Sequence, residues 1–133
     1  MRERKYPDEL EAIRRGVRTA EAVHRASREL LEPGMREIDY YGQLVARATS
    51  EAEAPVVMMC DLASGERAAG GGGAPGKRVI EAGDLVILDI FPYVEGYRGD
   101  ITNTLVAGGN PSSEQSELFE LVSSALEKAE ALI

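Results

Sequence analysis

Apolar residues recur every three or four positions from Asp8 to Leu31, which is the spacing of one face of an α-helix. The sequence therefore predicts a long amphipathic helix over these residues. Pro33-Gly34 ends it, because proline breaks the helical hydrogen-bond pattern and glycine favours the turn that follows. A shorter pattern from Ile38 to Ala48 predicts a second helix, antiparallel to the first.

Short apolar runs in the middle of the chain predict an antiparallel sheet. Val56–Cys60 and Leu85–Ile90 are typical of buried strands. Tyr97–Ala107 is the expected partner of the second strand, across a reversal at Pro92–Gly96. Residues 64–76 are expected to form a loop, because their four consecutive glycines lose much backbone entropy in any regular element.

The last part of the chain predicts a third long helix. Ser112 and Gln115 have the spacing of a capping box, and an apolar stripe follows them. We expect this stripe to pack on the sheet. It continues to Ile133 without a polar last turn or a glycine cap, which predicts a truncated domain. The order of the elements indicates one α+β unit over residues 1–133, with no separate linker.

Composition narrows the class of protein. With 44% hydrophobic residues, the 133-residue chain can bury one core. No apolar run approaches the roughly 20 residues that cross a membrane, so we expect no membrane partner. The single cysteine, Cys60, cannot form an internal disulfide, and no apolar signal-peptide core follows the N-terminus, so a cytoplasmic location is expected.

The charge of the chain is unevenly distributed. The net charge is −8, and residues 81–133 alone contain ten acidic and two basic side chains. A nucleic acid is therefore not an expected partner, because binding its phosphates needs clustered lysine and arginine. An acidic segment attracts cations instead.

The candidate chemistry lies in two aspartates. Asp89 interrupts an apolar strand, where an unpaired carboxylate is costly to bury. If the reversal centres between Val94 and Glu95, Asp89 lies directly opposite Asp100. Two such carboxylates can bind divalent cations such as Mn²⁺, Mg²⁺ or Zn²⁺, pair with Arg98 in a salt-bridge cluster, or share a proton.

The segments around these aspartates resemble a known family. Residues 82–89, which end in Leu-Asp, and residues 95–104, Glu-Gly-Tyr-Arg-Gly-Asp-Ile-Thr-Asn-Thr, are similar to the metal-binding hairpin of the pita-bread metallopeptidases. That family includes methionine aminopeptidases, Xaa-Pro aminopeptidases, prolidases and creatinase. Residues 31–37, 63–65 and 108–112 resemble Xaa-Pro peptidase-like members in the same order. The resemblance covers essentially the whole chain and implies the N-terminal half of the pita-bread fold.

The resemblance also implies roles for individual residues. Asp89 would be a terminal ligand of one metal ion, Asp100 would bridge two ions, and the Thr102 hydroxyl would orient a carboxylate. The complete enzyme would hold two divalent ions, Mn, Co or Zn. Its remaining ligands, one histidine and two glutamates, belong to a second half that this chain lacks. We therefore assign no catalytic residue and expect weak or no metal binding by this chain alone.

The function implied is that of a metal-dependent aminopeptidase of the Xaa-Pro type, a hydrolase that cleaves N-terminal peptide bonds with metal-activated water. This chain alone is expected to be inactive. The alternative is a non-catalytic interaction or structural module, in which Asp89, Asp100 and Arg98 form a salt-bridge cluster. Gly72 occupies the place of a family histidine that contacts substrate, so the resemblance leaves the substrate specificity open.

The partners expected are a peptide substrate and a second protein surface. The apolar stripe of the last helix would bind either another copy of the chain or a complementary C-terminal half. His24, the only histidine, matches no ligand position of the family and is expected on the helix surface or at the edge of the core.

Overall fold

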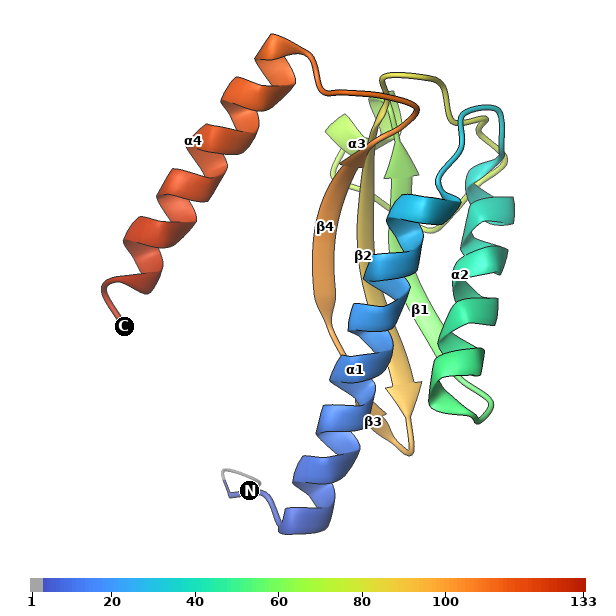
Figure 1. Ribbon diagram of the computed structural model, residues 1–133, viewed down its shortest axis with the longest axis vertical. Coiled ribbons are helices and arrows are strands. Elements are labelled where there is room, and N and C mark those ends of the chain that lie inside the picture. The colour runs from blue at the N-terminus through green and yellow to red at the C-terminus, as the bar shows by residue number, and fades with distance from the viewer. Residues whose placement is uncertain (1–3) are drawn as a thin grey trace.

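The structure, a computed structural model, describes residues 4–133. Two long helices form one layer (Figure 1). Helix α1 spans Pro7–Leu30 and helix α2 spans Glu37–Ala52, so both predicted helices are confirmed. Proline is favoured at the first turn of α1 because it has no N–H group to leave unpaired, and the Tyr6 N–H donates to Glu9 Oε2 at 2.9 Å.

The second layer is a four-stranded antiparallel sheet. Its strands are β1 (Val57–Ser64), β2 (Leu85–Val94), β3 (Tyr97–Arg98) and β4 (Ile101–Val106). Strand β2 is central, with β1 on one side and β3 and β4 on the other. The predicted strands are confirmed, although β1 runs four residues beyond Cys60, and the predicted partner of β2 is interrupted at residues 99–100.

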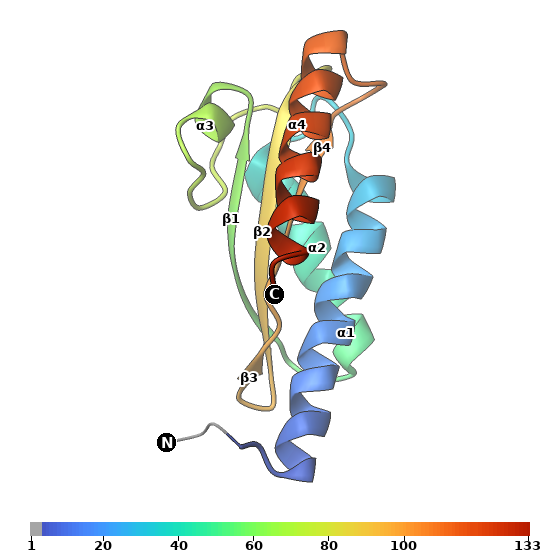
Figure 2. The same ribbon diagram turned by 90° about the vertical axis from the view of Figure 1, so that its left-hand side faces the viewer.

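The helices cover one face of the sheet (Figures 1 and 2). Even-numbered residues of β2 point into this interface and are buried, while odd-numbered residues point away. The core is aliphatic apart from Tyr40, whose hydroxyl donates to the Ser27 carbonyl at 2.9 Å. Its largest buried apolar side chains come from both layers and from the segment before β2: Val23, Tyr40, Leu44, Leu62, Ile80, Val86, Leu88 and Ile90.

The opposite side of the sheet, the open face, carries the odd-numbered residues of β1 and β2 and the even-numbered residues of β4. They are Val57, Met59, Asp61, Ala63, Leu85, Ile87, Asp89, Phe91, Tyr93, Thr102, Thr104 and Val106. The four-residue helix α3 (Glu66–Ala69) lies on this side, near the end of β1 (Figure 2). It falls inside the segment predicted to be only a loop, so that prediction is wrong for these four residues.

A buried carboxylate holds the glycine-rich segment in place. Glu37 is fully buried and accepts hydrogen bonds from the Ser64 N–H and hydroxyl, each at 2.8 Å, and from the Gly76 N–H at 2.9 Å. Arg67 of α3 forms an ion pair with the same carboxylate. Next to it, Arg78 donates to the Ser64 hydroxyl at 2.7 Å. Glu37 therefore ties α2, β1 and the loop together.

Helix α4 (Ser113–Glu130) begins at the predicted capping box. The Gln115 N–H donates to Ser112 Oγ at 3.2 Å, and the Ser112 N–H donates to Gln115 Oε1 at 2.9 Å. The expected packing of this helix on the sheet is wrong: α4 has no buried residue and stands away from the β4 edge (Figures 1 and 2). The Gln115 side chain donates to the Gly83 carbonyl at 3.0 Å and fixes where the helix starts.

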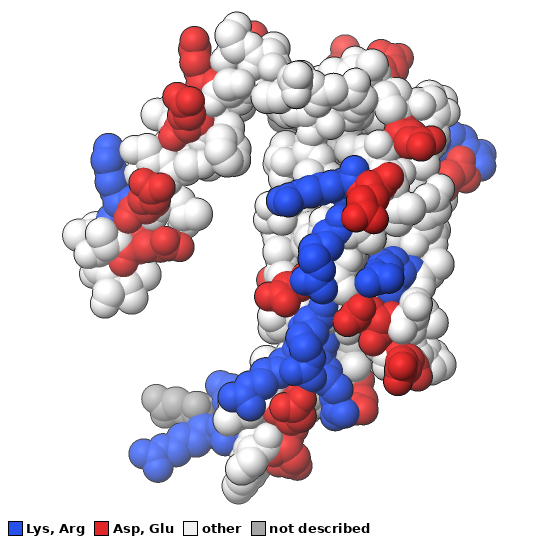
Figure 3. Space-filling view, viewed as in Figure 1, with Lys and Arg blue, Asp and Glu red and all other residues white. Residues whose placement is uncertain are grey.

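The surface charges follow the helices. Acidic side chains lie along α4, and arginines run down the exposed side of α1 (Figure 3). Five of the ten acidic residues after position 80 belong to α4: Glu114, Glu117, Glu120, Glu127 and Glu130. Among residues 4–133, no helix is long and apolar enough to cross a membrane.

Candidate metal centre

Asp89 lies in the middle of the open face. It is half-buried on β2 and is paired with Thr102 of β4 on one side. The Thr102 hydroxyl donates a hydrogen bond of 2.5 Å to Asp89 Oδ1. A hydroxyl that donates to one carboxylate oxygen restricts the rotation of the carboxyl group, so Thr102 orients Asp89.

The predicted register of this hairpin is wrong by two residues. Asp89 lies opposite Thr102, not opposite Asp100, because the reversal consists of only Glu95 and Gly96, with φ of 51° and 84°. Positive φ at both central residues is typical of the tight turn that suits the twist of a hairpin. A shift of two residues preserves the alternation of side chains, so the strand faces are still predicted correctly.

Asp100 lies in the break between β3 and β4. The Gly99 N–H donates to the Pro92 carbonyl at 3.0 Å, so β3 and β4 pair with β2 in the same register on both sides of the break. This register sets Asp100 opposite Phe91, on the open face and diagonal to Asp89. Diagonal neighbours in an antiparallel pair are roughly 7–8 Å apart. The two aspartates therefore share a face as diagonal neighbours and do not lie directly opposite each other.

Arg98 interacts with Asp100 and with two aromatic rings. Its guanidinium is 3.3 Å from Asp100 Oδ2, and it lies 5.2 Å from the ring centre of Phe91 and 6.0 Å from that of Tyr93. Both charged side chains are about half exposed, so water screens the pair and it contributes little to stability. The salt-bridge alternative grouped Arg98 with Asp89 and Asp100, and the structure shows the Arg98–Asp100 ion pair of that group.

A third carboxylate, Asp61, was missed by the sequence analysis. The predicted strand stopped at Cys60, but β1 continues to Ser64 and pairs Asp61 directly with Asp89. The signal was the alternation of residues 57–64, which places Asp61 on the same face as Met59. Gly72 lies next to it, since a methyl group at Gly72 would be 3.5 Å from Asp61 Cβ.

Cys60 points to the other side of the sheet, against the core. Burial raises the pKa of its thiol to about 12, and the negative charges of Asp61 and Asp89 act in the same direction. The thiol therefore stays protonated at neutral pH and packs as a small apolar group.

The donor set of the described residues is incomplete for a metal centre. Carboxylate oxygens suit divalent ions such as Mn²⁺ and Zn²⁺, so Asp89 and Asp100 fit such a site chemically. Yet within residues 4–133 no three His, Cys, Asp or Glu side chains come close enough together to hold an ion. Asp89 and Asp100 by themselves are too few donors for a complete coordination shell.

His24 connects helix α1 to strand β4 from the core side. It is 8% exposed, with Nε2 2.8 Å from the Ile101 carbonyl oxygen and Nδ1 3.3 Å from Asn103 Nδ2. Since a carbonyl oxygen only accepts, the proton is assigned to Nε2, and Nδ1 accepts from the Asn103 amide. Its position at the edge of the core agrees with the sequence analysis.

Burial is the main reason that the pKa of His24 is lowered, with a smaller contribution from Arg28. The unfolded chain takes up a proton near pH 6.5, whereas folded His24 remains neutral to a lower pH. We therefore expect the free energy of unfolding, measured by urea titration, to fall as the pH drops from about 7.5 to about 5. His24→Gln, which has no ring to protonate, should flatten this dependence; equal slopes for the two proteins would contradict it.

An antiparallel sheet with carboxylates on its open face and two helices behind it is the arrangement of the pita-bread metallopeptidases, and solved structures of that class share this fold. Residues 11–133 match metallopeptidase family M24. The chain belongs to this family. The family is one of metal-dependent peptidases, so divalent metal ions and peptides are its cofactors and substrates.

Several relatives of this chain are named as Xaa-Pro peptidases. The Xaa-Pro dipeptidase of Pyrococcus furiosus is 32% identical over 126 residues, which are 94% of this chain and 36% of that protein. The Xaa-Pro aminopeptidase of Escherichia coli is 28% identical over 127 residues, 96% of this chain and 29% of that protein. The structure of the prolidase from Pyrococcus furiosus has a TM-score of 0.84 and 30% identity, covering 94% of this chain and 37% of the other. The chain spans about a third of the length of these curated relatives.

Proposed function

We propose that residues 1–133 form part of the catalytic domain of an Xaa-Pro-type aminopeptidase, and that this chain by itself is catalytically inactive. The observation that carries the proposal is the position of Asp89 and Asp100 on one open sheet face in a chain that matches family M24 over residues 11–133. The relatives named as Xaa-Pro peptidases favour peptides with proline in second position as the substrate class.

In this proposal Asp89 and Asp100 are ligands of two divalent metal ions, and Thr102 orients Asp89. A bound ion of this kind supplies an activated water molecule for hydrolysis. This chain holds the ligand in place. The pairing of β2 with β4 fixes the backbone of Asp89, and the Thr102 hydroxyl limits the rotation of its carboxyl group. Among Mn, Co and Zn, we take manganese as the first ion to test. We also propose a cytoplasmic location, because the half-buried free thiol of Cys60 is compatible with a reducing compartment.

The proposed inactivity rests on the number of ligands. Two carboxylates leave most coordination positions of a divalent ion to other groups, so binding by this chain should be weak. Purified chain supplied with Mn²⁺ and an Xaa-Pro dipeptide should release no free proline. Turnover that Asp89→Asn abolishes would show that the chain is active alone.

Calorimetric titration with Mn²⁺ separates the proposal from the non-catalytic alternative. We expect weak, saturable uptake that Asp89→Asn removes, because the amide is a poorer ligand than the carboxylate. Asp8→Asn, the same change at an exposed carboxylate of α1, is the matched control and should leave uptake unchanged. No saturable uptake by the unmodified chain would favour the interaction module, in which Asp89, Asp100 and Arg98 form a salt-bridge cluster.

A further inference from the structure

Two charged side chains lie on either side of Asp89 on the open face, one on each neighbouring strand. Asp61 of β1 is paired directly with Asp89, and it has no hydrogen bond or ion pair within residues 4–133. Arg98 of β3 is paired with Tyr93, so its side chain leaves the sheet on the same face. The face therefore offers an acceptor for a cation on one side of Asp89 and a donor for an anion on the other.

The half-buried Asp61 lies beside the glycine-rich segment. Its neighbour there is Gly72, which has no side chain that could lie over the carboxylate. Like charges that lie directly opposite each other in a sheet repel, so a cation bound at Asp61 would relieve its repulsion with Asp89. A peptide carries such a cation in its N-terminal ammonium group.

Two aromatic rings hold the Arg98 guanidinium over the open face. Its contacts with Phe91 and Tyr93, at 5.2 Å and 6.0 Å from the ring centres, are cation–π interactions that favour one position of this long side chain. Its ion pair with Asp100 is one contact of 3.3 Å through one nitrogen. A guanidinium has five N–H groups, so Arg98 can bind a second carboxylate while it stays beside Asp100.

We infer that these two side chains bind the charged ends of a free dipeptide, Asp61 the ammonium group and Arg98 the carboxylate. The inference rests on the proposed function and narrows its substrate class from peptides to dipeptides. The one peptide bond of such a substrate then lies over Asp89, between the two charges. Asp61 and Arg98 are thus specificity-determining residues beside the proposed metal ligands.

The distance between the two charges matches the length of a dipeptide. Strands are about 4.8 Å apart and residues along a strand about 3.3 Å, so a guanidinium over Phe91 is roughly 10–12 Å from the Asp61 carboxylate. An extended dipeptide measures about 6 Å from its nitrogen to its carboxylate carbon, and a hydrogen bond of about 2.9 Å at each end brings the span to about 12 Å. Each further residue would move the carboxylate about 3.5 Å beyond Arg98.

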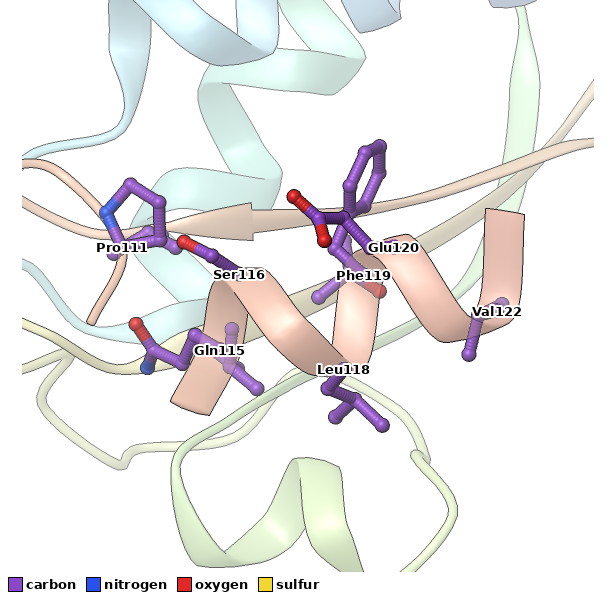
Figure 4. A pocket seen from close by; sticks show the side chains of 10 residues that line it. Pro111, Gln115, Ser116, Leu118, Phe119, Glu120 and Val122 are labelled. Atoms are coloured by element: carbon purple, nitrogen blue, oxygen red, sulfur yellow. The ribbon is translucent and has the colours of Figure 1, made fainter. Parts of the chain in front are cut away.

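The cavity at the other end of the face is a poorer site for a charged peptide. It measures about 490 Å³ and lies between the first turns of α4 and Leu85 of β2. Figure 4 shows the apolar side chains of Leu118, Phe119 and Val122 beside it. Glu120 is the only charged side chain among the described residues that line it, so this cavity offers no cation to a carboxylate.

Titration of the full chain with peptides, followed by the NMR shifts of its backbone amides, tests the inference. A chelator in the buffer prevents turnover and makes the result independent of the proposed metal function. We expect Ala-Pro to shift the amides of Asp61 and Arg98 with a dissociation constant on the order of 1 mM. N-acetyl-Ala-Pro lacks the ammonium group and Ala-Pro amide lacks the carboxylate. Each should bind about three- to fivefold more weakly, as expected for the loss of one partly exposed charge pair.

Two variants assign each end of the peptide to its residue. Asp61→Asn should weaken the binding of Ala-Pro by the same factor and leave that of N-acetyl-Ala-Pro unchanged. Arg98→Gln should likewise weaken Ala-Pro and leave Ala-Pro amide unchanged. Arg47→Gln is the matched control, because Arg47 is also about half exposed and lies 3.3 Å from Glu51, but on helix α2. This control should not alter the affinity for any of the three peptides.

Three outcomes would overturn the inference. They are equal affinities for the free and the blocked peptides, variants that weaken all three peptides alike, and the absence of any saturable shift with Ala-Pro. None of them bears on the proposed function, which the Mn²⁺ titration tests separately.

Discussion

Replacing Glu37 by alanine should lower the free energy of unfolding by about 3–5 kcal/mol, the range for breaking a buried charged network. Glu37 is fully buried and accepts hydrogen bonds from two backbone N–H groups, those of Ser64 and Gly76. Without the carboxylate the Ser64 N–H remains buried and unpaired, at about 1–3 kcal/mol, and the partly buried Gly76 N–H also loses its acceptor. Urea unfolding followed by circular dichroism measures the loss.

The matched control for this change is Asp39→Ala. Asp39 lies two residues further along α2 and also forms an ion pair, with Arg36 Nε at 2.6 Å, but on the exposed surface. Water screens such a pair, so the unfolding midpoint should hardly move. Equal losses for Glu37→Ala and Asp39→Ala would mean that the buried network contributes nothing beyond a surface ion pair.

Replacing Gly99 by alanine should cost about 3 kcal/mol, the upper part of the range for overpacking a tight site. Gly99 is buried where β3 gives way to β4 and contacts the backbone of α1. The added methyl carbon would lie 2.7 Å from the Gly16 carbonyl carbon and closer still to its oxygen. Because backbone cannot rotate aside as a flexible side chain can, α1 and the strand must separate.

This substitution should also move Asp100, the next residue. Hydrogen exchange measured by mass spectrometry should show faster exchange of the amides of β4 in Gly99→Ala. Gly42→Ala is the control, because Gly42 lies within α2 with nothing within 4 Å of the added methyl group. Alanine there should stabilise the helix by about 0.5–1 kcal/mol. Unchanged stability of Gly99→Ala would contradict the close approach of the two backbones.

The long elements could be predicted from sequence because their signals are local. The apolar spacing of α1 spans more than six turns, and the capping box of Ser112 and Gln115 depends on residues three positions apart. The end of β1 was less predictable. Asp61 and Ser64 are polar, and only pairing with β2 and the contact of Ser64 with buried Glu37 keep that segment in the sheet.

The candidate site was predicted in part. Asp89 stood out because a carboxylate is unusual within an apolar strand, and the two-residue period correctly placed Thr102 on its face. The residue that lies directly opposite Asp89 was not predictable, since the register of the hairpin depends on whether the turn contains two residues or more. Asp61 was missed because its proximity to Asp89 arises from strands that are separated by the whole glycine-rich segment.

By itself, the sequence determined the α+β class, the hairpin that carries Asp89 and the family resemblance; the comparisons confirm the class and the family. These features depend on periodicity and on residues close together along the chain. The tertiary structure alone decided that Thr102 faces Asp89, that Glu37 is the buried anchor of the loop, and that α4 stands off the sheet. The reason is that strand register and helix packing are set by contacts between distant segments, which no local pattern encodes.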